Sequence, residues 1–277
     1  MKESLPKIGL ALGSGGPRGL AHIGVIKALE QENISIDFIA GCSIGAMVGG
    51  LYALTKDIAW IEKIAMETDW RRIISLLAEP SLLSGGLIGG EKIEKFLLDQ
   101  VGKKKFQHLQ IPFVAVATDI NSGKEVRITE GDLVTAIRAS SSVPLIFKPT
   151  KREGRLLVDG GLSNPVPCDV VRKMGASVVI AVNLDNYFSH NTSRISDTNG
   201  GKLAIYRVAL NSLNILRYHL SQHCVKEADL VITPKVDENS WAQFANGGEI
   251  IKKGEAEIQL NLLRIKDLIR SKTTKAS

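Results

Sequence analysis

The sequence predicts an α/β fold, a three-layer sandwich with a mostly parallel central sheet. Three observations indicate this class. Short apolar runs alternate with stretches of helical periodicity, the first two runs each end at glycines that open a helix, and a further buried run follows at 177–184. With 44% hydrophobic and 23% charged residues over 277 positions, the chain can bury a core of useful size.

Two strand–turn–helix units open the chain. Residues 7–12 form an apolar run that leads into glycines, and apolar residues then recur at helical spacing from 18 to 31. The same order follows at 36–41, a predicted strand, and 46–54, a predicted helix. Strand, glycine turn and helix in this succession are typical of a parallel sheet with covering helices.

The remaining elements follow as shorter units and then as long helices. Further helices are predicted at 57–77, 91–100, 133–140, 202–225 and 247–271, and further strands at 112–120, 124–129, 155–161 and 177–184. Loops are expected at 80–90, where the chain should be mobile, and at 189–201. No repeat or linker is evident, so we expect a single domain over 1–277, with a motif-bearing core at about 7–185 and a helical C-terminal part at about 201–272.

Charge and cysteine content limit the binding partners and the cellular locations that we expect. The formal charge is +6, which suits anionic surfaces or acidic substrates without choosing among them. Three cysteines without CxxC spacing argue against a disulfide framework or a zinc site and favour a reducing, cytoplasmic location. The most apolar stretch, 34–54, is interrupted by Asp37 and several glycines, so any membrane contact should be peripheral, at the inner membrane surface.

The stretch GCSIG at 41–45 has the spacing of a nucleophile elbow, G-x-S-x-G, between a predicted strand and a predicted helix. Residues two before and two after the nucleophile must be very small in such a tight turn. Around Ser43 these are Gly41 and Gly45, whereas Cys42 would place the β-branched Ile44 there. Ser43 is therefore the candidate nucleophile, and Cys42 is expected to face the core.

No histidine has the sequence context of a catalytic base. The five histidines are His22, His108, His190, His219 and His223. A Ser–Asp–His order would need one of the last three, but in that fold several strands precede the elbow, and here only two do. A structural or solvent-facing role is favoured for each, with His22 packed or hydrogen-bonded near the glycine loop.

Asp159 is the alternative base. It ends a predicted strand in VDGG, which should place it at the carboxyl edge of the sheet. An ordinary aspartate is a weak base for a serine, but partial burial and a hydrogen bond to the hydroxyl can increase its basicity. Taken alone, an aspartate before glycine is more typical of a turn.

The stretch LGSGGPRGLAHIG at 12–24 predicts an anion-binding loop. Its glycines leave backbone N–H groups free to point at an anion, a helix follows at once, and Arg18 adds a positive charge. Such a loop can hold a phosphate or the oxyanion of an acyl transfer. It is not a dinucleotide fingerprint, because arginine occupies position 18, and it lacks the Gly-Lys-Ser/Thr of a Walker loop.

Together these motifs resemble the patatin-like phospholipase family. The resemblance is carried by GSGGPRG, GCSIG and DGG, and by the blocks AIRASSSVPLIFKP at 136–149 and ATDINSGKEV at 117–126. It covers roughly residues 7–185 in the order that the family has. The resemblance implies a patatin-like sandwich with a nucleophile elbow and a serine–aspartate dyad in place of a triad.

Carried over residue by residue, the resemblance makes Ser43 the nucleophile and Asp159 its base. The backbone amides near Gly15 and Gly16, with Arg18, would hold the oxyanion, and the Ile44 N–H is a further donor. The glycines that shape the two motifs are Gly41, Gly45, Gly160 and Gly161. Two departures from the family pattern stand out: Cys42 replaces the more usual threonine, and Ser14 and Pro17 interrupt the glycine run.

The leading hypothesis is a lipid acyl hydrolase of phospholipase A, lysophospholipase or esterase type, with a phospholipid or other acyl ester as substrate and with no metal or cofactor. Basic residues at 103–105, and the cluster Lys148, Lys151, Arg152 and Arg155, could contact an anionic membrane. The alternatives are an acyltransferase to an acceptor other than water and a weakly catalytic protein that binds a membrane or partner. Nucleic-acid binding is not expected, because aromatics are 5% and no recognition motif is present. The sequence does not define the oligomeric state.

Overall fold

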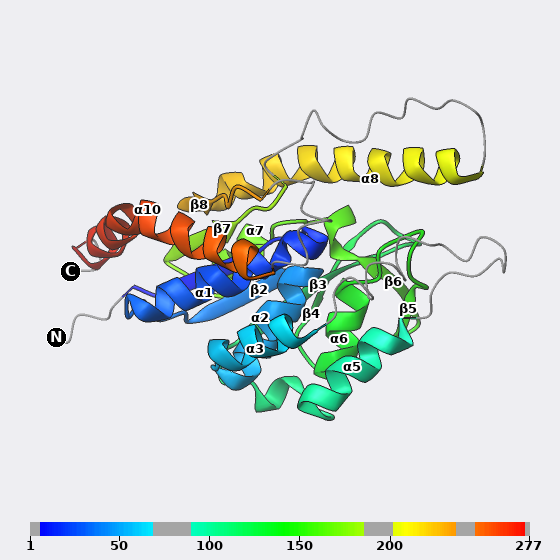
Figure 1. Cartoon of the computed structure of the whole chain (residues 1–277), viewed down its shortest axis with the longest axis horizontal. Coiled ribbons are helices and arrows are strands. Elements are labelled where there is room, and N and C mark those ends of the chain that lie inside the picture. Colours follow the sequence, from blue (N-terminus) through cyan, green and yellow to red (C-terminus); the bar gives the residue numbers. More distant parts are fainter. Residues whose placement is uncertain (1–5, 69–89, 186–201, 237–246, 275–277) are drawn as a thin grey trace.

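A computed structural model describes residues 6–68, 90–185, 202–236 and 247–274. Its centre is an eight-stranded sheet in the order β5-β6-β3-β2-β1-β7-β8, with β4 paired to β3 (Figure 1). The strands are β1 (Ile8–Leu12), β2 (Phe38–Cys42), β3 (Phe113–Asp119), β4 (Glu125–Ile128), β5 (Thr150–Arg152), β6 (Arg155–Asp159), β7 (Val178–Val182) and β8 (Leu230–Ile232). The pairs β2–β1, β1–β7, β2–β3 and β7–β8 are parallel, and β4, β5 and β6 add antiparallel pairs.

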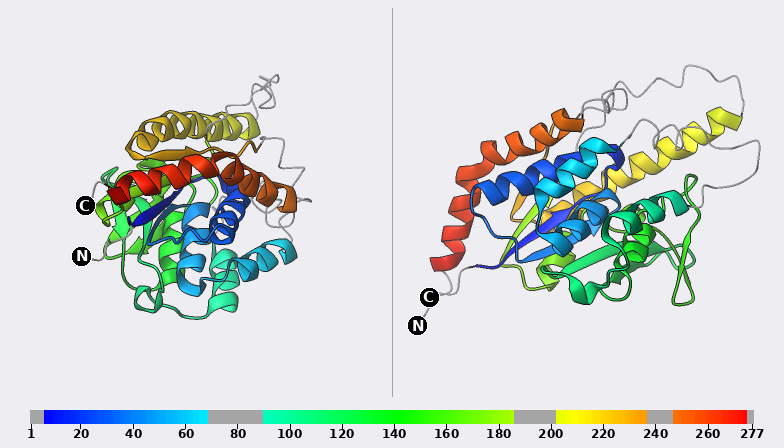
Figure 2. Two further views of the ribbon diagram at one scale, coloured as in Figure 1. Left: turned by 90° about the vertical axis from the view of Figure 1, so that its left-hand side faces the viewer. Right: turned by 60° about the horizontal axis from the view of Figure 1, so that its bottom comes forward.

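Helices cover both faces of the sheet, as the three-layer prediction requires. The α-helices are α1 (Ala21–Gln31), α2 (Ile44–Thr55), α3 (Ile58–Glu67), α5 (Glu91–Val101), α6 (Leu133–Ser140), α7 (Cys168–Lys173), α8 (Lys202–Cys224) and α10 (Gly247–Thr274). α10 packs along α1, and α8 runs along the outside of the molecule (Figure 2).

Alternation along the strands separates the two layers of core. On β1, Leu10 and Leu12 join the cluster formed with α1, α2, α3 and α10, whereas Ala11 joins the smaller cluster around α7. β7 divides in the same way, with Ile180 on the first side and Ala181 on the second. This period of two, with both sides apolar, is what a sheet buried on both faces requires.

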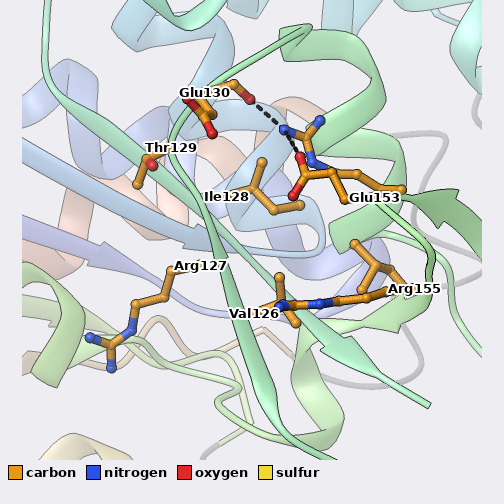
Figure 3. Close-up of a pocket in the computed structure, with 9 residues that line it drawn as sticks. Val126, Arg127, Ile128, Thr129, Glu130, Glu153 and Arg155 are labelled. Atoms are coloured by element: carbon orange, nitrogen blue, oxygen red, sulfur yellow. Dashed lines mark hydrogen bonds and ion pairs between the residues drawn. The ribbon is translucent and has the colours of Figure 1, made fainter. Parts of the chain in front are cut away.

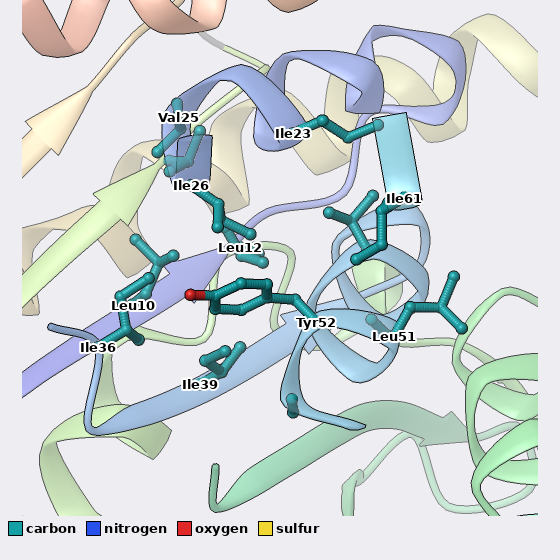
Figure 4. Close-up of a cluster of buried hydrophobic side chains, with 14 of the residues drawn as sticks. Leu10, Leu12, Ile23, Val25, Ile26, Ile36, Ile39, Leu51, Tyr52 and Ile61 are labelled. Atoms are coloured by element: carbon teal, nitrogen blue, oxygen red, sulfur yellow. The ribbon is translucent and has the colours of Figure 1, made fainter. Parts of the chain in front are cut away.

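The larger cluster lies directly beneath the elbow helix. Tyr52 of α2 lies among Leu10, Leu12 and Ile39, with its ring against both central strands (Figure 4). Its hydroxyl donates a 2.6 Å hydrogen bond to Glu30, so the polar end of this buried ring is satisfied. The packing holds α2, and with it the turn that precedes the helix, against β1 and β2.

The structure confirms most of the expected elements and corrects several. The helix expected from residue 18 begins as a short 3-10 turn, η1 (Gly16–Leu20), before α1. The helix expected at 57–77 ends at Glu67, and residues 69–89 lie outside the described part, as does the loop at 189–201. Among the described strands and α-helices, three short ones were not predicted: β5, α7 and β8. Since β8 joins the sheet, the C-terminal part is not wholly helical.

None of the helices within the described ranges combines the length and hydropathy needed to cross a bilayer.

Candidate active site

Asp159 lies level with Ser43, on the far side of β3. We expected Asp159 at the carboxyl edge of the sheet, and it lies level with the carboxyl end of β2, but its strand β6 runs antiparallel to β3. The two residues meet because β3 extends past the end of β2. Cys42 pairs with Val116, and Asp159 pairs with the next residue, Ala117. The residue after Cys42 and the end of β6 therefore reach the same height.

Ser43 occupies a strained turn between β2 and α2. Its φ of 56° and ψ of −121° are rare for a residue with a side chain, and the residue is 7% exposed. A Cβ at Gly41 would collide with the carbonyl oxygen of Gly45, and one at Gly45 would collide with that of Leu12. This is the geometry of a nucleophile elbow, and it explains why both flanking glycines are needed.

The end of α6 fixes the backbone on both sides of the site. The Ser43 N–H donates a 2.9 Å hydrogen bond to Oγ of Ser140, which in turn donates to the carbonyl of Val116 on β3. Two residues on, the carbonyl of Ser142 accepts a 3.0 Å hydrogen bond from the Asp159 N–H. The serines of the block 136–149 thus position the elbow and the aspartate together, a role that the sequence did not reveal.

The carboxyl group of Asp159 is buried and only partly satisfied. Oδ1 accepts a 2.8 Å hydrogen bond from the Gly161 N–H, whereas Oδ2 is buried without a hydrogen-bond partner. Burial raises the pKa of Asp159 above its usual value, and hydrogen bonding from the nearby Ser43 side chain and from Gly161 only partly opposes this. The contact between the Ser43 side chain and the carboxyl group is weaker than a fully formed hydrogen bond. The carboxyl is a stronger base than an exposed aspartate.

Cys42 is buried, as expected, but its thiol does not face only apolar side chains. Its Sγ lies 3.9 Å from Oδ1 of Asp159. Burial, and next the charge of Asp159, raise the pKa of Cys42 well above its usual value, so the thiol stays protonated. The geometry therefore agrees with glycine spacing in disfavouring Cys42 as a nucleophile.

The glycine loop leads into the N-terminus of η1, and the elbow leads into the N-terminus of α2. The first backbone amides of a helix have no acceptor within that helix. Gly15 precedes η1, Gly16 is its first residue, and Ile44 is the first residue of α2. The amides of the two preceding residues are engaged, because Gly13 and Ser14 donate to the carbonyls of Val182 and Pro165. The two termini are adjacent, since a Cβ at Gly19 of η1 would collide with the Ile44 side chain. Amides arranged in this way can bind an anion.

A known protein family matches this chain. The family model described as patatin-like phospholipase matches residues 10–172, more than half of the chain. The chain belongs to the patatin-like phospholipase family. The match includes GSGGPRG, GCSIG and DGG, the motifs on which the resemblance was based.

Curated relatives are longer than this chain. An uncharacterized NTE family protein of Mycobacterium tuberculosis is 42% identical over 186 residues, which are 66% of this chain and 50% of that protein. Neuropathy target esterase sws of Drosophila melanogaster is 31% identical over 267 residues, 88% of this chain and 18% of that one. The chain therefore spans about half or less of these relatives.

A solved structure shows the same fold. The crystal structure of VipD from Legionella pneumophila aligns with a TM-score of 0.51 over 96% of this chain and 67% of that chain, at 11% identity. With so little identity, the similarity extends to the fold alone.

In this member of the patatin-like family, Arg18 does not carry an unpaired charge. Its guanidinium donates to Oδ1 of Asp185 at 2.9 Å and to the carbonyl of Gly15 at 3.3 Å. Asp185, 4% exposed, also accepts two hydrogen bonds from Arg217 of α8 and one from Oγ of Ser14. Neither Asp185 nor Arg217 was predicted from the sequence. Asp185 follows a buried strand, which was an available signal, whereas nothing in the sequence indicates that Arg217 faces inward.

The glycines after Asp159 allow α8 to approach. A Cβ at Gly160 would collide with the carbonyl of Val116, and one at Gly161 would lie 3.0 Å from Cδ of Arg217 and 3.0 Å from Oδ1 of Asp159. The arginine of α8 thus lies next to the carboxyl group. Its charge is one of the influences that keep the pKa of Asp159 from rising further, after the hydrogen bonds from Ser43 and Gly161.

Histidines play structural roles or lie at the surface in the part of the chain that is described. His22 is fully buried, and one ring nitrogen lies 2.8 Å from the carbonyl of Gly13. Burial lowers the pKa of His22 to about 4, so the neutral ring donates this bond and supports the glycine loop, as predicted. His108 accepts from the Lys105 N–H, and His219 and His223 are exposed on α8. His190 lies outside the described residues.

A separate cavity of about 90 Å³ lies beside β4 and the β5–β6 hairpin (Figure 3). Arg152, which lines it, donates to the carbonyl of Glu130 and pairs with Glu153 at 3.0 Å. The basic cluster predicted around 148–155 is thus partly neutralised by its own hairpin. Neither Ser43 nor Asp159 lines this cavity. Within the described ranges, no group of three or more His, Cys, Asp or Glu residues could bind a metal ion.

Proposed function

We propose that this protein is a serine hydrolase that cleaves carboxylic ester bonds of lipids through a Ser43–Asp159 dyad. The observation that carries the proposal is a buried carboxyl group of raised pKa, level with an elbow serine and beside two helix N-termini. Family membership and the name of the fly relative, an esterase, support the same reaction class.

In the proposed first half-reaction, Asp159 accepts the hydroxyl proton of Ser43 as the oxygen attacks the ester carbonyl carbon. The carbonyl oxygen becomes an oxyanion and accepts hydrogen bonds from the backbone amides of Gly15, Gly16 and Ile44. Collapse of the tetrahedral intermediate breaks the bond to the alcohol, which leaves with the proton from Asp159. Ser43 then carries the acyl group as an ester.

The second half-reaction repeats these steps with water. Asp159 takes a proton from the water as its oxygen attacks the acyl-enzyme, and the same amides stabilise the second oxyanion. The fatty acid is released, and the proton returns to Ser43. Because the raised pKa of Asp159 lies closer to neutral pH than that of an ordinary aspartate, proton transfer in both directions is easier.

For Arg18 we propose a positioning role rather than direct contact with the oxyanion. Its bonds to Asp185 and to the Gly15 carbonyl support this, because they orient the peptide whose neighbouring amides face the site. Arg18 shares Asp185 with Arg217, so its positive charge is only partly offset there, and its two bonds fix its orientation.

The proposed substrate class is a phospholipid, lysophospholipid or other acyl ester, met by peripheral contact with an anionic membrane. The net charge of +6 supports such contact. A cytoplasmic location at the inner membrane surface fits three free cysteines. We further propose that residues 1–277 act as a single domain, which is supported by β8 in the common sheet and by the packing of α10 on α1.

Hydrolysis of a short-chain nitrophenyl ester tests the proposal. Replacement of Ser43 with alanine should lower kcat by at least about a thousandfold, since the nucleophile is lost. Ser122→Ala, in an exposed turn, is the matched control and should retain full activity. Equal turnover by the Ser43→Ala protein would contradict the mechanism.

A further inference from the structure

α8 presents an apolar stripe to the outside of the molecule. Ile205, Val208, Ile215 and Leu216 are 70%, 48%, 41% and 66% exposed. Their spacings of three, seven and eight residues place the four side chains on one face of the helix. Ser212 lies between Val208 and Ile215 on the same face. Figures 1 and 2 show α8 running along the outer edge of the fold.

The opposite face of α8 is fixed to the candidate active site. Arg217 points inward and pairs with Asp185, and Ser221, one turn further on, is fully buried. η3 (Gly160–Leu162), the turn after Asp159, packs against the helix, and its Leu162 is 36% exposed. The stripe therefore lies on an element that borders the proposed dyad.

The charge of α8 indicates what covers the stripe. Its 23 residues include Lys202 and Arg207, besides the inward Arg217 that pairs with Asp185, and no aspartate or glutamate. An apolar face on a helix with only basic charges is typical of helices that lie in the interface of an anionic membrane. A second copy of the chain is a poorer match, because pairing through this stripe would bring two basic helices together in a complex of two chains of +6 each.

α10 offers a contrast within the same molecule. Leu260 and Leu263 are 79% and 80% exposed, so exposure of single leucines is not special to α8. However, α10 contains both acidic and basic residues along its length, including Glu257 and Asp267 on either side of these leucines. It lacks the combination of features found in α8.

We propose that the α8 stripe, formed by Ile205, Val208, Ile215 and Leu216, docks the protein on an anionic lipid surface. Docking would bring the proposed active site to esters embedded in that surface, and this role rests on the proposed lipid hydrolase function. Docking itself requires neither Ser43 nor Asp159. The inference therefore specifies which surface makes the membrane contact.

Co-sedimentation with vesicles of phosphatidylglycerol and phosphatidylcholine tests the proposal. The wild-type chain should bind these vesicles and bind pure phosphatidylcholine far less. The double variant Ile205→Asn/Leu216→Asn should lose at least about tenfold in partitioning, because it removes two large apolar side chains from the interface. The matched variant Leu260→Asn/Leu263→Asn should bind like the wild type. Both should hydrolyse a soluble short-chain ester within about twofold of the wild type.

A gain-of-signal variant covers the case in which the double variant misfolds. Leu216→Trp keeps the residue apolar, and its extra emission should be quenched by brominated lipids in anionic vesicles. Leu260→Trp is the control and should show no extra quenching.

The outcomes separate docking from catalysis. Failure of the wild-type chain to bind anionic vesicles, equal binding by the α8 double variant, or no quenching of Leu216→Trp would overturn the docking proposal. So would light scattering that shows a dimer dissociated by the α8 variant while vesicle binding is unchanged. Loss of the proposed hydrolase function would instead appear as soluble-ester turnover that does not depend on Ser43, with vesicle binding unaffected.

Discussion

Arg217 holds Asp185 through two parallel hydrogen bonds, from Nε to Oδ2 at 2.8 Å and from Nη2 to Oδ1 at 2.9 Å. The residues are 32 positions apart, one on α8 and the other just after β7. Asp185 also binds Arg18 and Ser14 of the glycine loop. A single buried carboxylate therefore links the outer helix to the backbone that is proposed to bind the oxyanion.

Removing Arg217 should destabilise the protein. Arg217→Met would leave Asp185 with one cation instead of two in a site where its side chain is 3% exposed. Loss of one partner from a buried ion pair costs about 3 kcal/mol, partly offset here by Arg18. Urea denaturation measures the change. Lys95→Met breaks the exposed pair with Asp99 and should cost less than about 0.5 kcal/mol. Equal effects of the two substitutions would show that the Asp185 network contributes little.

Ser140→Ala should impair both the elbow and its chemistry. The substitution removes the acceptor of the Ser43 N–H, which then stays buried without a partner, at a cost of about 1–3 kcal/mol. Because the same bond holds Ser43 at its positive φ, kcat for a soluble ester should fall more than KM rises. Ser142→Ala is the comparison, since its contact with Asp159 uses the backbone carbonyl and survives the change. An unchanged kcat in a folded Ser140→Ala protein would contradict the positioning role.

Activity should rise with pH through the raised pKa of Asp159 and then level off. The base must be ionised to accept the proton of Ser43, and burial raises the pKa of this carboxyl above about 3.9, the ordinary value. The acidic limb of kcat/KM should therefore have its midpoint above that value. A midpoint at or below it would contradict the assignment of Asp159 as a buried base.

The raised pKa of Asp159 also predicts that its contribution to stability falls with rising pH, whereas activity rises. A carboxyl group whose pKa is higher in the folded state binds protons more tightly there. The contribution of Asp159 therefore favours folding at a pH below its pKa in the unfolded chain. This contribution is lost as the pH rises through its pKa in the folded protein. Asp159→Asn should remove this pH-dependent loss. At neutral pH the variant should be at least as stable as the wild type in urea, while its ester turnover falls by about 100-fold or more. A strongly destabilised variant would indicate a structural aspartate.

Cys42→Ser should shift the acidic limb to lower pH. The thiol is a weak donor 3.9 Å from Oδ1 of Asp159, and a hydroxyl in its place is a stronger donor to the ionised form. Stabilising the carboxylate lowers its pKa, so activity should persist at more acidic pH. Cys224→Ser, at the end of α8, should leave the profile unchanged. A limb that stays in place in Cys42→Ser would mean that the residue beside the elbow does not tune the base.

The sequence predicts the central part of this fold well, because the patterns that indicate it lie within short stretches of the chain. Glycines are needed two residues before and two residues after Ser43, because a side chain at either position would collide with the backbone of the turn. Apolar runs at 7–12, 36–41 and 177–184 report strands buried on both faces, and β1, β2 and β7 lie there. The family resemblance added the partnership of Ser43 with Asp159, which remains a proposal.

What the sequence does not reveal depends on contacts between distant segments. The direction of β6 is set by its pairing with β3, and nothing within 155–161 encodes it. The inward orientation of Arg217 depends on Asp185, 32 residues away. The strands β5 and β8 have three residues each, too few for a periodic pattern, and are formed through pairing with their neighbours.

Mass spectrometry of the protein after treatment with a fluorophosphonate is the sharpest test of the Ser43–Asp159 dyad, because the probe bonds only to an activated nucleophile. We expect a single adduct on Ser43, formed much more slowly in Asp159→Asn and still formed in Cys42→Ser. An adduct on Cys42, or labelling of Ser43 at the same rate when Asp159 is replaced, would contradict the dyad.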